Sequence, residues 1–182
     1  MKIIGMAEPQ KFEITSGNML VTDPCYDKNE EDLKCQAKLP AKNGTWLATA
    51  EYSDENAWGR RVSRIIAWHE SNQKGAFSLC TKMYSVDIGV DSGQAGFFDY
   101  DKYPVDPRDE INEREFYTPV SDLTLASDSF GTIDFGAVSS SGFGDGGYDL
   151  YVDKNDSGEA IAVWIEFIAE ETNPEDDLYE DE

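Results

Sequence analysis

The stretch Ala137–Phe167, AVSSSGFGDGGYDLYVDKNDSGEAIAVWIEF, decides the fold that the sequence predicts. It begins with a strand of small residues and continues into a glycine cluster around Asp145. Two segments with alternating apolar and polar residues follow, and the turn Asp153–Gly158 joins them. Glycine reaches backbone conformations that other residues avoid, so the cluster predicts a structural turn that comprises Gly142, Gly144, Gly146 and Gly147.

Alternating segments of the same kind precede this stretch. Thr45–Tyr52 and Arg60–Glu70 predict two strands of a hairpin or meander, with Val62 and Ile66 on one face of the second strand. Tyr84–Asp91 has the clearest alternation in the chain. Its residues expected to face the core are Tyr84, Val86, Ile88 and Val90.

The opposite face of this last segment carries two carboxylates. A period of two places Asp87 and Asp91 on the same side of the strand, with only Gly89 between them. A glycine at this position leaves room for a ligand or for another stretch of backbone.

One segment has a helical pattern instead. Asp106 is predicted to be an N-cap and Pro107 the first helical residue, so a short helix should run to about Tyr117, before Pro119. Together the segments predict a mainly β fold, a single antiparallel β-sandwich or partly open barrel with one short helix. We expect a lead-in at residues 1–10, one domain at 11–169 and a disordered acidic tail at 170–182.

The charge of the chain is strongly negative. It has 37 Asp and Glu residues against 15 Lys and Arg, for a net charge of −22 at pH 7. Nine of the acids lie in Glu166–Glu182, and the rest of the chain still carries about −13. This balance opposes direct binding to nucleic acid, which relies on Lys and Arg, and binding to an anionic membrane. It permits a cationic ligand, a divalent ion or a basic protein surface as partner.

The cysteines and the N-terminus indicate a cytoplasmic protein. Cys25, Cys35 and Cys80 are odd in number and lack the spacing of a metal site, so we expect free thiols. The first residues are too short for a signal peptide, and no apolar run approaches the roughly 20 residues of a membrane span. A catalytic pair of Cys25 with His69, the only histidine, is an alternative, although nearby acids would raise the thiol pKa.

Three aspartates are candidates for a functional site. Asp23 ends a predicted strand before Pro24, Asp91 ends another, and Asp145 lies in the glycine cluster. If these strand ends share one rim of the sheet, the three carboxylates suit a divalent cation or a pair for acid–base chemistry. The alternative is three separate turns in which each carboxylate caps local amides.

Three blocks of the sequence resemble a known family. Ser16–Pro24, Val90–Gly96 and Ser141–Tyr148 occur in the same order in a bacterial and phage family named domain of unknown function 4241. The resemblance covers residues 14–168. Because that family has no established activity, the resemblance implies domain boundaries and not a reaction. Gln94 and Tyr148 lie in two of these blocks and join the three aspartates as predicted ligand-binding residues.

These features favour a binding protein over an enzyme. We expect a small acidic protein with a carboxylate-lined rim pocket, which takes a small polar or cationic ligand or a protein partner. One alternative is a metal-dependent hydrolase that uses the clustered aspartates, with a divalent cation as its cofactor. The other is an acidic inhibitor of the phage type that mimics nucleic acid or blocks a basic surface.

Overall fold

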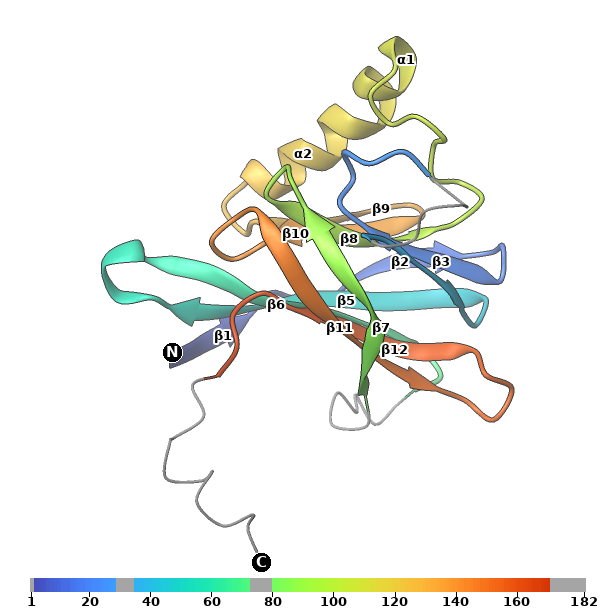
Figure 1. Cartoon of the computed structure of the whole chain (residues 1–182), viewed down its shortest axis with the longest axis horizontal. Coiled ribbons are helices and arrows are strands. Elements are labelled where there is room, and N and C mark those ends of the chain that lie inside the picture. Colours follow the sequence, from blue (N-terminus) through green and yellow to red (C-terminus); the bar gives the residue numbers. More distant parts are fainter. Residues whose placement is uncertain (1, 29–34, 73–79, 171–182) are drawn as a thin grey trace, which may run out of the picture.

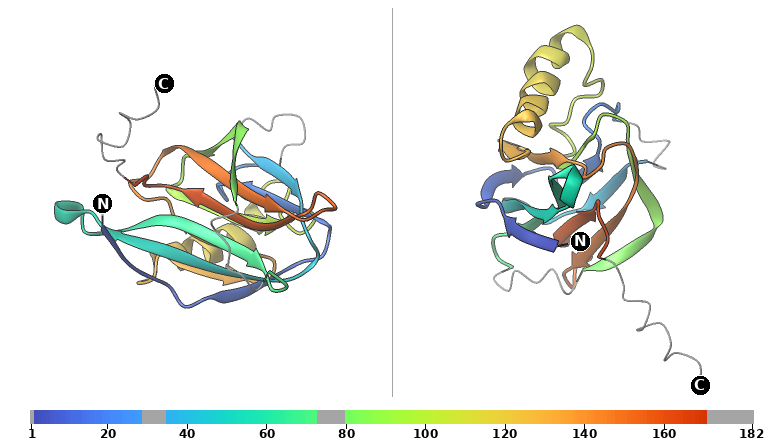
Figure 2. Two further views of the ribbon diagram at one scale, coloured as in Figure 1. Left: turned by 90° about the horizontal axis from the view of Figure 1, so that it is seen from below. Right: turned by 90° about the vertical axis from the view of Figure 1, so that its left-hand side faces the viewer.

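The protein forms three layers (Figure 1; Figure 2). The computed structural model describes residues 2–28, 35–72 and 80–170, and the predicted tail lies outside them from residue 171 onward. Two antiparallel sheets pack face to face, and one helical segment covers the outer side of the smaller sheet. The predicted fold class is confirmed, and the two separate sheets identify it as a sandwich.

The larger sheet has seven strands in the order β1-β5-β6-β12-β11-β7, and β2 also pairs with β5. Residues 2–6, which we expected to be part of a lead-in, form its edge strand β1. The strands are β1 (Lys2–Met6), β2 (Gln10–Ile14), β5 (Gly44–Asp54), β6 (Arg60–His69), β7 (Thr81–Val90), β11 (Gly146–Lys154) and β12 (Ala160–Glu166). The turn predicted between β11 and β12 is present.

The smaller sheet has five strands in the order β4-β3-β8-β10-β9. They are β3 (Asn18–Thr22), β4 (Ala37–Pro40), β8 (Gln94–Asp99), β9 (Phe130–Ile133) and β10 (Gly136–Ser140). Both faces of its central strands are covered. Phe97 packs into the core between the sheets and its neighbour Phe98 into a cluster beneath the helix. On β3, Met19 likewise packs into the core between the sheets and Leu20 into the cluster beneath the helix.

The helical layer runs from residue 110 to residue 125 in three parts, α1 (Glu110–Asn112), a π-helical turn (Glu113–Tyr117) and α2 (Thr118–Leu125). It therefore continues past the proline that we expected to limit it. Within the described residues, no helix combines the length and the apolar character that crossing a bilayer requires.

The predicted N-cap at Asp106 is wrong by three residues. The helix begins after Asp109, whose Oδ1 accepts a hydrogen bond from the N–H of Asn112 at 2.7 Å. The carboxylate of Asp106 instead accepts from the N–H of Arg108 at 2.9 Å, within the turn that precedes the helix. Both aspartates make local caps, and the sequence pattern alone did not show which of them begins the helix.

Register shifts change two of the predicted strand faces. Ser63 is an extra residue on β6, because the pairing of β5 with β6 shifts there. The bulge reverses the alternation, so Val62 shares the core with Ile65, and the expected common face of Val62 and Ile66 is wrong. On β7 the expected core residues are buried except Tyr84, which is 89% exposed and lies within the stretch where the pairing with β11 shifts.

A buried carboxylate, Asp99, stands at the end of β8. Its Oδ2 accepts hydrogen bonds from the N–H groups of Thr15 and Ser16 at 2.6 and 3.0 Å, and its Oδ1 accepts from those of Asp101 and Lys102. Burial raises the pKa of Asp99, but these backbone donors outweigh burial, so the pKa lies below its usual value. The charged carboxylate therefore joins the β2–β3 turn to the end of β8.

We expect Asp99→Asn to lower the free energy of unfolding at neutral pH by about 2–5 kcal/mol, because the amide leaves buried donors without an acceptor. A lowered pKa stabilises the fold above the pKa of the unfolded chain, about 3.9, and this contribution is lost as the pH falls through the folded pKa. The variant should therefore lose less stability than wild type on acidification. Urea denaturation at several pH values measures both effects.

The exposed residue Asp101 provides the matched control for this experiment. Asp101→Asn should stay within about 0.5 kcal/mol of wild type and keep the wild-type acid dependence. Equal stability of Asp99→Asn and Asp101→Asn would contradict the structural role of Asp99.

Candidate functional site

The candidate site is a shallow cavity of about 670 Å³ at the ends of β7 and β11. We call it the acidic cavity, because three of its lining residues are aspartates and, among the described residues that line it, none is Lys or Arg. Its lining comprises Tyr26, Cys35, Asp87, Gly89, Val90, Asp91, Asp145, Gly146 and Gly147. Two of the three predicted aspartates, Asp91 and Asp145, therefore open on one space.

Strand pairing brings these residues together. Gly146 lies opposite Val90 and Gly147 lies opposite Gly89, so the start of β11 runs beside the end of β7. Asp145 directly precedes this pairing. The glycines place no side chains in the cavity and Cys35 packs against Gly89, so the three carboxylates surround the space that remains open.

The glycine cluster shapes the approach to this cavity. Gly142 and Gly144 have φ values of 64° and 115°, in the region that favours glycine, and they lie in the turn between β10 and β11. Gly146 and Gly147 instead begin β11. The predicted structural turn is therefore confined to the first two of its four glycines.

Asp23, the third predicted aspartate, is fully buried and lies behind the cavity. Its Oδ2 accepts hydrogen bonds from the N–H groups of Asp91 and Ser92, both at 2.8 Å. Its Oδ1 accepts from the N–H of Cys25 at 2.8 Å and from the Ser92 hydroxyl at 2.6 Å. With four donors, the carboxylate of Asp23 positions the backbone of the site and does not face a ligand.

Gln94 and Tyr148 also support the site from behind. The amide of Gln94 is 5% exposed; its Nε2 donates to the Ser121 hydroxyl at 3.2 Å and its Oε1 accepts from the Thr124 hydroxyl at 3.0 Å. The hydroxyl of Tyr148 donates to the carbonyl of Gly144 at 2.6 Å and so holds the β10–β11 turn. Neither residue is among those that line the acidic cavity.

The space above Gly89 is filled by the chain segment at Cys35, with the Cys35 side chain nearest to it. The N–H of Gly89 donates to the carbonyl of Cys35 at 3.0 Å, and a Cβ at Gly89 would lie 2.9 Å from the Cβ of Cys35. The sequence left two possibilities for the space beside Gly89, a ligand or another stretch of the chain. The structure shows another stretch of the chain.

Tyr26 and Asp87 are the site residues that the sequence prediction did not include. The hydroxyl of Tyr26 donates to Oδ2 of Asp91 at 2.6 Å. Burial, and then this hydrogen bond, raise the pKa of Tyr26, so the phenol keeps its proton and orients the carboxylate. The alternation of residues in β7 placed Asp87 on the same face as Asp91, so the sequence did contain a signal for Asp87 as a site residue. No pattern in the sequence indicated Tyr26.

The site does not have the arrangement of a metal centre or of a cysteine enzyme. Among the described residues, no group of three or more His, Cys, Asp or Glu side chains could hold a metal ion. His69 contacts the Ser71 hydroxyl and the Asn43 carbonyl, whereas Cys25 lies beside Asp23. Burial, and then the charge of Asp23, raise the pKa of Cys25 to about 12, which opposes a thiolate nucleophile.

Comparison of the chain with models of protein families, with curated proteins and with solved structures found no match. The resemblance to domain of unknown function 4241 therefore stays a prediction.

Replacing Asp23 by Asn should lower the free energy of unfolding by about 2–5 kcal/mol, because an amide group would face backbone donors that need an acceptor. Asp91→Asn is the matched control. Its side chain is exposed and its remaining oxygen can still accept from Tyr26, so we expect a change within about 1 kcal/mol. Urea denaturation measures both, and an Asp23→Asn protein as stable as the control would contradict the role of Asp23.

The three thiols should differ in their rates of alkylation. Burial also raises the pKa of Cys80 to about 12, so at about pH 8 both Cys25 and Cys80 stay protonated. Cys35 is exposed and should react first with iodoacetamide. Peptide mass spectrometry gives the order, and the denatured chain, in which all three thiols should react alike, is the control. Preferential modification of Cys25 would favour the cysteine-enzyme alternative.

Proposed function

We propose that this chain is a binding protein whose acidic cavity takes an ammonium or guanidinium group, either of a small organic cation or of a basic side chain on a protein partner. The observation that carries the proposal is that Asp87, Asp91 and Asp145 line one open cavity, with no Lys or Arg among the described lining residues. Clustered carboxylates repel one another, and a bound cation relieves that repulsion.

The groups around the cavity support a cation rather than an anion. Asp91 is oriented by the Tyr26 hydroxyl, which remains a donor to it. Asp149, opposite Asp87 on β11, has its charge balanced by Lys82 at 3.1 Å, whereas no such ion pair exists for Asp87 among the described residues. The net charge of −22 adds a long-range attraction for cations.

The two alternatives drawn from the sequence have less support. A metal-dependent hydrolase lacks a cluster of ligands among the described residues. An acidic inhibitor of a basic surface stays a prediction, because it rests on the net charge and on no particular arrangement of the described side chains.

Putrescine is a suitable probe, with butanediol as its uncharged analogue. Nuclear magnetic resonance titration should show saturable shifts at the amides of Asp91, Asp145 and Gly147 with the diamine only. Added salt should weaken the binding, since the site is open to solvent. Mg²⁺ and Ca²⁺ are tested in parallel, and tight binding of either ion at these amides would favour the hydrolase alternative.

A triple variant, Asp87→Asn with Asp91→Asn and Asp145→Asn, should weaken putrescine binding by roughly tenfold or more. The matched control changes the net charge equally at exposed acids that do not line the cavity, Glu110→Gln with Asp122→Asn and Asp156→Asn. The control should bind nearly as wild type. If both triple variants lose the same affinity, the binding reflects overall charge and the proposed site is wrong.

A further inference from the structure

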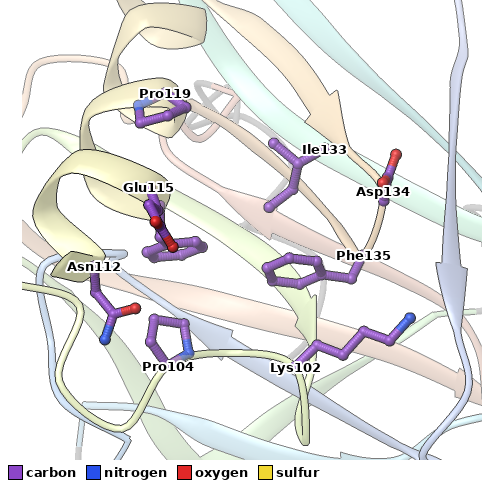
Figure 3. Close-up of a pocket in the computed structure, with 9 residues that line it drawn as sticks. Lys102, Pro104, Asn112, Glu115, Pro119, Ile133, Asp134 and Phe135 are labelled. Carbon is purple, nitrogen blue, oxygen red and sulfur yellow. The ribbon is translucent and has the colours of Figure 1, made fainter.

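A second cavity of about 460 Å³ lies between the helical layer and the β9–β10 turn (Figure 3). We call it the helix cleft. Asn112, Glu115 and Phe116 line it from the helix. Ile133, at the end of β9, and Phe135, in the turn, line it from the opposite side. None of its lining residues belongs to the acidic cavity, so it is a separate site.

The helix wall of this cleft has an irregular backbone. The N–H of Thr118 donates to the carbonyl of Glu113, five residues earlier, which makes this segment a π-helical turn. Pro119 has no N–H to donate to the carbonyl of Glu115 four residues before it, and this explains why the regular pattern is interrupted here. Such single turns are rare in helices and occur frequently at functional sites.

The floor of the helix cleft is aromatic. The rings of Phe116 and Phe135 stack with their centroids 6.0 Å apart and their planes 16° from parallel. Phe116 is held from below by edge contacts with Phe98 and Tyr103, so the floor is part of a packed cluster. Ile133 extends this apolar surface along the β9–β10 turn. A flat apolar group of a ligand fits such a surface.

Acceptor atoms occupy one side of the cleft. Nδ2 of Asn112 donates to the Asp106 carbonyl and to the Asp109 carboxylate, both at 3.0 Å, and this leaves its Oδ1 directed toward the cleft in Figure 3. Glu115 lines the same cavity, and no ion pair holds its carboxylate among the described residues. The ammonium of Lys102 points away from Glu115.

We propose that the helix cleft binds a small amphipathic amine. Its flat apolar body packs on Phe116, Phe135 and Ile133, while its ammonium group donates hydrogen bonds to the Glu115 carboxylate and to Oδ1 of Asn112. The ammonium group also lies near the faces of the aromatic rings, which attract cations. This proposal goes beyond the acidic cavity, whose described lining holds three carboxylates but no pair of stacked aromatic rings.

Tryptamine is the probe, and indole and indoleacetate are its matched analogues without the ammonium and with the opposite charge. In titrations of the full chain followed by nuclear magnetic resonance, tryptamine should shift the amides of Glu115, Phe116 and Phe135 in a saturable way. Indole should bind roughly tenfold more weakly, and indoleacetate more weakly still.

Glu115→Gln should lower the affinity for tryptamine roughly five- to tenfold, because Glu115 is the proposed partner of the ammonium group. It is exposed, so the variant should fold. Asp134→Asn is the control on the other wall, since the carboxylate of Asp134 points away from the cleft in Figure 3, and it should bind nearly as wild type. Asp91→Asn should also leave these shifts unchanged, which separates the cleft from the acidic cavity.

Four results would overturn the proposal. Tryptamine could fail to produce saturable shifts at the cleft, or indole could bind as tightly as tryptamine. The third is preferential binding of indoleacetate that is lost in Lys102→Met, which would make the cleft a site for anions. Shifts that Asp91→Asn abolishes would place the bound tryptamine in the acidic cavity instead.

Discussion

The hydrogen bonds to the buried carboxylate of Asp23 are the interaction on which the acidic cavity depends. Burying a charge is costly unless it is fully hydrogen-bonded, and here four donors surround it. Asp23 follows a strand of the smaller sheet, whereas Asp91 follows a strand of the larger one. The carboxylate therefore joins the two sheets at one end of the sandwich. Because it holds the backbone of Asp91, it determines where the side chain of Asp91 meets Tyr26 and the cavity.

Asp99 has the same role at the other end of the β3–β8 ladder, where it accepts four backbone N–H groups. Two buried aspartates thus hold the turns at opposite ends of one strand pair, and the exposed aspartates between β7 and β11 remain available for a ligand. The large excess of acids therefore includes two kinds of carboxylate, one structural and one facing solvent. The proposed binding of a cation concerns only the second kind.

Period-two alternation was enough to predict most of the long strands, their antiparallel arrangement and the common face of Asp87 and Asp91, but it did not predict β1 or β4. The strand end at Asp91 and the glycine cluster around Asp145 were the reason to expect these two residues at one rim, and both line the acidic cavity. The sequence pattern did not show that Asp23 is buried, because a carboxylate that caps backbone amides and one that faces a ligand both follow strand ends. The bulge at Ser63 and the helix beyond Pro119 depend on tertiary packing, and local propensity does not encode them. Tyr26 meets Asp91 across 65 residues, a contact that no local pattern signals.

Amide hydrogen exchange tests the role of Asp23 most directly. The amides of Asp91 and Ser92 lie in a turn at the edge of an open cavity, where exchange would ordinarily be fast. If their N–H groups donate to a buried carboxylate, they should exchange as slowly as the amide of Phe97 in the doubly covered strand β8. Exchange as fast as that of the exposed turn residue Asp156 would contradict the account.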